Sequence, residues 1–278
     1  MKYKNLGTSK IPALGLGTWG MGGKDVPDTT QDKENISLLQ QAIDLGITLI
    51  DTAEFYGNGH TEELIGEAIA NYKRENLFLC VRVGFEHLRY NDVITSAKNS
   101  LKRLHTDYID LFSIQKPNPD IPLKETLEAM NTLRDTGIVK HLGVSNFAVP
   151  DLREAMRYSQ NEIVANHLEY NLCTRNQARF NTDVESKIIP FCQENNIAVI
   201  AWRPLALGKL AKVRILEDLS HKYHKTPSQI ALNWLISKKG IVTIPKSSSI
   251  AHIQENLGSM GWHMSQADYD LLERCKEF

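Results

Sequence analysis

The sequence predicts a (β/α)8 TIM barrel, in which eight parallel β-strands close into a barrel and helices surround it. Two observations predict it: eight short apolar runs alternate with amphipathic helical stretches, and no linker or shift in composition interrupts them along 278 residues. We therefore expect residues 1–278 to form a single domain. The alternative is an open doubly wound sheet, but the glycines within 15–20 lack the spacing of a dinucleotide-binding turn.

A hairpin is expected before the barrel, because segments 3–6 and 10–12 flank a Gly7-Thr8-Ser9 turn. We expect this hairpin to cap the bottom of the barrel. The barrel strands follow as short apolar runs between helical stretches. They are predicted at 14–17, 47–50, 77–83, 109–114, 141–144, 163–168, 198–201 and 241–244.

The helices are indicated by apolar faces and by capping residues. One such face, after the third barrel strand, consists of Ile94, Ala97, Leu101 and Leu104. Gly137 marks the end of a helix over 123–136, and Thr226 precedes a proline in the first turn of another. Ser265 is expected to start a final helix.

Composition excludes several classes of protein. With 42% hydrophobic residues, 23% charged residues and a formal charge of -1, the chain shows no basic excess that would favour nucleic acid or a membrane surface as partner. The beginning lacks the apolar core of a signal peptide, and no apolar run approaches membrane-spanning length, so we expect a cytoplasmic protein. The four cysteines are widely separated, which predicts free thiols and no metal site.

The stretch Asp51-Thr52-Ala53-Glu54-Phe55-Tyr56-Gly57 carries the clearest candidate chemistry. It follows the apolar run 47–50 and precedes a helical pattern, so it is expected at the carboxyl end of a barrel strand. Barrel enzymes place their chemistry at that end. Asp51 and Tyr56 are therefore a candidate pair of acid and proton-donating phenol. The alternative is a helix cap beside a half-exposed aromatic ring.

Several further motifs occur in a fixed order, and with them the sequence resembles the aldo-keto reductase family over essentially its whole length. The motifs are Gly15-Leu16-Gly17-Thr18-Trp19, Asp51-Thr52-Ala53 with Tyr56-Gly57, Asp107-Tyr108-Ile109-Asp110-Leu111, Gly143-Val144-Ser145-Asn146-Phe147, Glu169-Tyr170-Asn171, Pro204-Leu205, Ile244-Pro245-Lys246-Ser247 and Glu255-Asn256. The resemblance implies a barrel that binds a nicotinamide cofactor and passes hydride to an aldehyde or ketone.

The resemblance also implies catalytic roles, and two of the four positions depart from the family. Tyr56 would protonate the carbonyl oxygen, with Asp51 and a lysine tuning the phenol and a histidine orienting the substrate. Arg82 stands at the lysine position, Gln115 at the histidine position, and Lys116 where tryptophan is usual. A guanidinium lacks the compact shape of an ammonium, and an amide cannot titrate. We therefore expect carbonyl reduction to be impaired.

Strand alternation predicts the lining of the substrate pocket. If Arg82 faces the barrel interior, Cys80 and Gly84 share its side, and Ser113 shares the side of Gln115. Trp19 is expected to complete the pocket. Where the family commonly has aromatic residues, Gly84 and Lys116 would supply space and an amine.

The cofactor implied by the resemblance is NADPH. His167 and Trp202 stand where a glutamine and a tyrosine usually hold the nicotinamide, while the adenosine end is better matched. The positions implied to contact the cofactor are Gly17, Thr18, Ser145, Asn146, His167, Trp202, Pro204, Leu205, Lys246, Ser247, Glu255 and Asn256. The expected partner is a small-molecule carbonyl or a non-native ligand.

The departures leave alternative functions open. Their concentration at inward positions of two adjacent strands favours an engineered scaffold over a natural divergent homologue, with a pocket enlarged for another ligand or reaction. In such a scaffold Lys116 would form a Schiff base for retro-aldol chemistry, or Cys80 with His167 would cleave esters. A third alternative is an NADPH-binding module without turnover.

Overall fold

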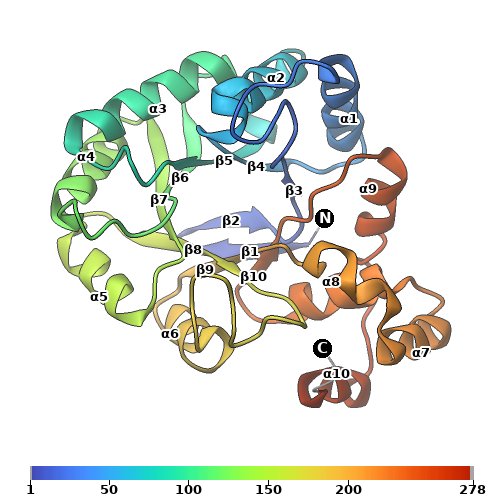
Figure 1. Ribbon diagram of the computed structural model, residues 1–278. Helices are drawn as coiled ribbons and strands as arrows, with labels where there is room; N and C mark the ends of the chain where they lie inside the picture. The colour runs from blue at the N-terminus through green and yellow to red at the C-terminus, as the bar shows by residue number, and fades with distance from the viewer. Residues whose placement is uncertain (1, 276–278) are drawn as a thin grey trace.

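The computed structural model describes residues 2–275, and in it eight parallel strands form a barrel with the helices outside (Figure 1). The predicted barrel is therefore confirmed. The strands are β3 (Leu16–Gly17), β4 (Leu49–Ala53), β5 (Phe78–Val83), β6 (Ile109–Ile114), β7 (Val139–Ser145), β8 (Ile163–Glu169), β9 (Ala198–Trp202) and β10 (Ile241–Thr243). They pair in sequence order, and parallel bridges from Leu14 to Thr243 and from Gly17 to Lys246 join the first strand to the last.

One predicted strand boundary was wrong in a way that affects the site. The run 47–50 was expected to end before Asp51, but β4 extends from Leu49 to Ala53. Asp51 pairs with Cys80 of β5, and Ala53 pairs with Arg82. Backbone pairing to the neighbouring strand thus outweighs the local turn preference of the Asp-Thr sequence. The carboxylate is held by the sheet itself, within the strand.

The helices begin and end close to the predicted signals. Thr226 Oγ1 accepts a hydrogen bond from Gln229 N at 3.2 Å, and Ser265 caps the last helix in the same way. Over residues 2–275, no helix combines the length and the apolar character that crossing a membrane requires. The helices are α1 (Asp32–Asp44), α2 (His60–Ile69), α3 (Tyr90–Leu104), α4 (Leu123–Asp135), α5 (Val149–Tyr158), α6 (Ile189–Glu194), α7 (Arg214–Tyr223), α8 (Pro227–Ser237), α9 (Ile250–Leu257) and α10 (Gln266–Arg274), with short helical turns η1 (Tyr56–Gly59), η2 (Arg74–Asn76), η3 (Val184–Ile188) and η4 (Ala206–Lys212).

The N-terminal hairpin closes one end of the barrel, as predicted. Strands β1 (Tyr3–Leu6) and β2 (Ser9–Pro12) cross the centre of the ring of strands in Figure 1. Leu6 and Ile11 are fully buried and belong to the same apolar cluster as the interior residues Leu49, Leu111 and Ile200. The hairpin therefore supplies the floor of the barrel interior, and the opposite end is left for the site.

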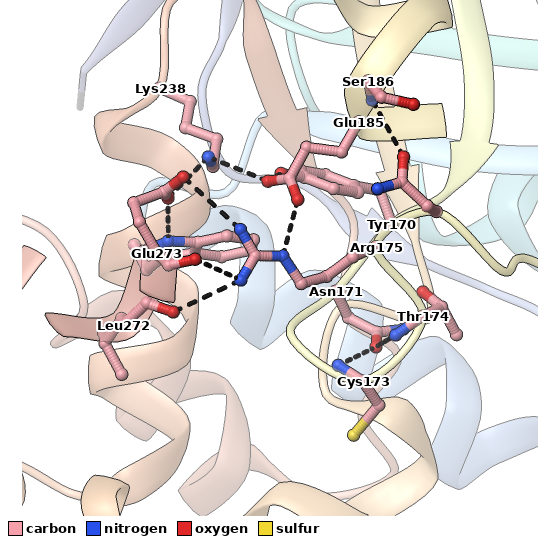
Figure 2. A network of polar contacts seen from close by, with 12 residues as sticks. Tyr170, Asn171, Cys173, Thr174, Arg175, Glu185, Ser186, Lys238, Leu272 and Glu273 are labelled. Carbon is pink, nitrogen blue, oxygen red and sulfur yellow. Dashed lines mark hydrogen bonds and ion pairs between the residues drawn. The ribbon is translucent and has the colours of Figure 1, made fainter. Parts of the chain in front are cut away.

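The C-terminal helix is fastened to the barrel by a network of charged and aromatic side chains (Figure 2). Lys238 Nζ lies 2.6 Å from Glu273 Oε1 on α10 and 3.3 Å from Glu185 Oε1 on η3. Arg175 pairs with Glu185 at 2.6 Å, and Trp234 Nε1 donates to Glu273 Oε1. A cavity of about 590 Å³ adjoins this network. None of the predicted site residues lines it.

Candidate active site

Neighbouring strands bring the predicted catalytic residues together at the carboxyl end of the barrel. Asp51 lies on β4, Arg82 lies on β5 opposite Ser113 of β6, and Gln115 directly follows β6. Asp51, Arg82 and Ser113 are all buried. Side chains that alternate along adjacent parallel strands meet in layers inside a barrel, which is why residues distant in the sequence become neighbours here.

Arg82 is the centre of the site. Its Nη2 donates to Asp51 Oδ1 at 2.7 Å and to the phenol oxygen of Tyr56 at 2.7 Å. Its Nη1 donates to Gln115 Oε1 at 3.1 Å. One guanidinium therefore links the acid, the phenol and the amide. Because Arg82 donates to the phenol oxygen, the phenol proton remains available for another acceptor.

Tyr56 is held against the opposite loop by a close backbone contact. Gly57 has a φ of 54°, and a Cβ placed there would lie 2.4 Å from the backbone oxygen of Gly22. Only glycine fits this position without displacing the loop. Tyr56 itself is 7% exposed, so the expectation of a half-exposed ring beside a helix cap does not apply.

Electrostatics favour a protonated phenol beside a permanent cation. Burial raises the pKa of Tyr56 above its ordinary value, while the Arg82 charge acts to lower it. Burial acts to lower the pKa of Arg82, but Asp51 and Tyr56 raise it above its ordinary value. Tyr56 thus carries a proton at neutral pH, and Arg82 remains charged.

Asp51 is held by Thr18, which directly follows β3, and by His167 of β8 as well as by Arg82. Thr18 Oγ1 donates to the backbone oxygen of Asp51 at 2.9 Å, and His167 Nε2 lies 3.1 Å from Asp51 Oδ2. His167 was expected at the nicotinamide amide of a cofactor. Its ring adjoins the Asp51 carboxylate inside the barrel and is fully buried.

Three potential metal ligands also meet here. One ligand atom each from Asp51, Cys80 and His167 lies within 4.8 Å of the others. However, Arg82 already occupies Asp51 Oδ1, and burial together with Asp51 raises the pKa of the Cys80 thiol well above its ordinary value. A protonated thiol is a poor metal ligand and a poor nucleophile. The arrangement favours a hydrogen-bonded network over a metal site or a cysteine esterase.

The predicted pocket positions have neighbours that limit their roles. A Cβ placed on Gly84 would lie 3.3 Å from Glu54 Oε1 and 3.7 Å from the Phe55 ring, so these side chains take part of the space that the missing aromatic leaves. Lys116 Nζ lies 3.8 Å from the centroid of the Phe85 ring. The amine of Lys116, which the sequence predicted to lie in a pocket near Arg82, is partly buried and lies against this aromatic ring.

The residues expected at a nicotinamide form a connected group. Asn146 Nδ2 donates to the backbone oxygen of Gln115 at 3.0 Å and to Ser145 Oγ at 2.9 Å. Asn146 Oδ1 is buried and has no hydrogen-bond partner among residues 2–275. A buried acceptor without a partner costs stability unless a ligand satisfies it. Trp202 lies at the end of β9, and its ring centroid is 6.2 Å from that of Phe180.

The residues expected at the adenosine end lie where β10 leads into α9. Ser247 Oγ donates to the backbone oxygen of Ser249 at 2.8 Å, and Ser249 caps α9. Glu255 and Asn256 lie on that helix, and Lys246 is bridged to Gly17 across the barrel seam. Pro204 and Leu205 lie between β9 and η4. The seam therefore joins the motif that contains Gly17 to the motif that contains Lys246.

Sequence reasoning missed several residues at the site. Glu54 Oε1 accepts a hydrogen bond from Gly84 N at 2.7 Å and lies 2.9 Å from His87 Nδ1. Phe55 meets the Tyr56 ring edge-on at 5.1 Å. Both lie within the Asp51–Gly57 stretch, so their position was a usable signal. No signal in the sequence predicted Phe180 at the site, because its loop has no recognisable motif.

Comparisons with known proteins agree with this architecture. Residues 13–277 match the Aldo/keto reductase family model. The chain is 33% identical over 275 residues to the methylglyoxal reductase YeaE of Escherichia coli (strain K12), covering 97% of this chain and 92% of that protein.

Solved structures agree as well. A thermostable aldo-keto reductase, Tm1743, in complex with the inhibitor epalrestat, superposes with a TM-score of 0.94 and 44% identity, covering 98% of this chain and 99% of that one. An aldo/keto reductase from Klebsiella pneumoniae in complex with NADP and acetate gives a TM-score of 0.86 and 32% identity over 96% and 92% of the two chains. The chain belongs to the aldo-keto reductase family.

Proposed function

We propose that this protein reduces an aldehyde or ketone with NADPH, using Tyr56 as the proton donor and Arg82 in place of the family's lysine. The observation that carries the proposal is the pair of 2.7 Å contacts from Arg82 Nη2 to Asp51 and to the Tyr56 phenol. A lysine ammonium in that position would be expected to make the same two contacts. The guanidinium therefore keeps the positive charge and both contacts, although it is planar and bulkier than an ammonium.

NADPH fits the residues present. Asn146 Oδ1 is a buried acceptor in need of a donor, and a nicotinamide carboxamide offers one. Ser145 would hold the same group, with Lys246 and Ser247 at the 2'-phosphate and Glu255 and Asn256 at the adenine. The Klebsiella pneumoniae relatives solved with NADP and with NADPH support this assignment. When bound, NADPH supplies the hydride.

The chain's own residues would handle the proton. Tyr56 donates its phenol proton to the carbonyl oxygen as negative charge develops there, and Arg82 stabilises the phenolate that remains. Gln115 accepts from Arg82 through Oε1, which leaves its Nε2 as the donor toward the substrate oxygen. Because an amide does not titrate, Gln115 can position the carbonyl but cannot supply a proton. We infer a slow reductase whose pocket is remodelled relative to the family's usual set.

Steady-state oxidation of NADPH with a simple aldehyde tests the proposal. The Tyr56→Phe variant should lose about 10²- to 10⁴-fold in kcat, the usual contribution of a positioned acid. NADPH binding, followed by cofactor fluorescence, should remain. The double variant Arg82→Lys with Gln115→His should turn over faster than the parent. Unchanged turnover in Tyr56→Phe would remove the assigned proton donor, and a parent as fast as the double variant would contradict the inferred slow rate.

A further inference from the structure

Three basic side chains on the loops at the open end of the barrel lie against aromatic rings. Lys24 Nζ lies 5.5 Å from the centroid of Trp19, and Lys116 Nζ lies 3.8 Å from that of Phe85. The guanidinium carbon of Arg179 lies 5.2 Å from the centroid of Phe180. We call Lys24, Lys116 and Arg179 the rim cations. They come from three different loops, after β3, β6 and β8.

The rings under these cations are all exposed. Trp19 is 42% exposed, Phe85 is 37% exposed and Phe180 is 46% exposed. Exposed aromatic rings on the loops around a barrel opening offer apolar surface to a ligand. Each ring is thus both an apolar surface and a support for a positive charge.

Backbone contacts place two of the rim cations beside the catalytic group. The backbone oxygen of Lys24 accepts a hydrogen bond from Gly57 N at 2.7 Å, and Gly57 follows Tyr56. Lys116 follows Gln115, whose Oε1 accepts from Arg82. The third rim cation, Arg179, lies against Phe180, whose ring centroid is 6.2 Å from that of Trp202. A substrate whose carbonyl reached Tyr56 would pass this rim.

Three carboxylates of the same region have other partners, while Asp25 and Glu86, which also lie there, are exposed. Glu54 accepts from Gly84 N, and Glu169 accepts from Arg179 N and pairs with Arg203 at 3.5 Å. Asp28 accepts from Thr30. Within residues 2–275, no carboxylate oxygen lies within 4.0 Å of the charged nitrogens of the rim cations. Their charge is therefore not neutralised by the protein at close range.

We propose that the substrate of this site is an oxo acid, an aldehyde or ketone that also carries a carboxylate. The carbonyl would reach Tyr56, the apolar body would lie on Trp19 and Phe85, and the carboxylate would face the rim cations, chiefly Lys116. This inference rests on the reductase proposed above. Cations around a partly desolvated opening raise the local concentration of anions and the rate at which they enter.

A matched pair of substrates tests the inference: 4-carboxybenzaldehyde and its neutral methyl ester, methyl 4-formylbenzoate, each at saturating NADPH. We expect kcat/KM to favour the acid by roughly tenfold, with the advantage decreasing as salt screens the charges. Lys116→Gln should remove most of that ratio. Lys98→Gln, at an exposed position on α3, should keep it. Equal kcat/KM for acid and ester, or a ratio unchanged in Lys116→Gln, overturns the inference.

A binding measurement separates this inference from the proposed reaction. Titration of tryptophan fluorescence with the two compounds, without cofactor, should show tighter binding of the acid in the parent and not in Lys116→Gln. If neither aldehyde is reduced but this preference is found, the reductase proposal fails and the oxo-acid site stands. If both are reduced at equal rates and bound equally, the reductase stands and the oxo-acid site fails.

Discussion

At the scale of single residues, Arg82 takes part in both a buried ion pair and the proposed catalytic group. It is 4% exposed and forms a close ion pair with Asp51, which is 1% exposed. Such a pair is costly to bury, but once buried each partner depends on the other. The same guanidinium tunes and holds Tyr56. We therefore expect Arg82 to contribute to stability in addition to its proposed role in the reaction.

This dependence gives the first prediction. Arg82→Met should lower the free energy of unfolding by about 3–5 kcal/mol, because it leaves the Asp51 carboxylate buried without a cation. Urea denaturation followed by far-UV circular dichroism measures the change. Arg82→Lys, which keeps a positive charge near Asp51, should lower the free energy of unfolding by clearly less. Equal losses in the two variants would show that packing of the long side chain, and not its charge, stabilises the pair.

At the scale of elements, Asp268 joins α10 to the end of α7. The hydrogen bond from Lys222, followed by those from Ser265 and Tyr223, lowers the pKa of Asp268 from 3.8 to about 2. A carboxyl whose pKa is lower in the folded state stabilises the fold above its unfolded pKa. That contribution is lost as the pH falls through the folded pKa. The relevant window is therefore between 3.8 and about 2.

The second prediction follows from that window. At neutral pH, Asp268→Asn should unfold at lower urea concentration than the parent, because the charged acceptor is gone. The difference should shrink as the pH falls from about 4 toward 2, where the parent's own carboxyl becomes protonated. Denaturation midpoints at a series of pH values measure it. Asp218→Asn on α7, at an exposed position, is the matched control. A difference that stays constant with pH would contradict the assignment.

The network in Figure 2 makes a third prediction at the same scale. Lys238 lies between Glu185 and Glu273 with its side chain 13% exposed. Lys238→Met should lower the free energy of unfolding by about 1–3 kcal/mol, because it leaves the carboxylate oxygens of Glu185 and Glu273 with fewer partners. Amide hydrogen exchange should rise more in α10 than in α3. The neighbouring exposed residue supplies the control Lys239→Met, and similar exchange in both variants would show that the network does not hold α10.

At the scale of the whole molecule, the hairpin and the barrel share one interior. Leu6 and Ile11 are fully buried against side chains from several barrel strands. A barrel filled by layers of side chains is a packed core, so its floor should not unfold separately from its wall. The hairpin is therefore expected to contribute to the stability of the entire chain.

The fourth prediction tests this coupling. Leu6→Ala should lower the free energy of unfolding by about 2–5 kcal/mol, the usual cost of truncating a buried leucine. Tryptophan fluorescence and circular dichroism should report the same shifted transition. Tyr3→Ala, on the same strand but 53% exposed, should change it little. A normal barrel transition in Leu6→Ala would mean that the hairpin is only loosely attached.

The barrel architecture could be predicted from the sequence. Strand and helix periodicity, Thr226 and Ser265 as caps, and the unbroken alternation predicted the barrel because these are local signals. The ordered motifs also indicated the family. The local reading failed at the end of β4, since only pairing with β5 carries the strand through Asp51 to Ala53.

The connections within the site could not be predicted and depend on how the chain folds in three dimensions. Composition and order could place Asp51, Tyr56, Arg82 and Gln115 at one end of the barrel. They could not show that one guanidinium reaches the other three, because that depends on side-chain directions set by strand register and packing. Of the rings beneath the rim cations, the sequence predicted Trp19 but not Phe85 or Phe180, since loops that meet in space share no pattern in the sequence.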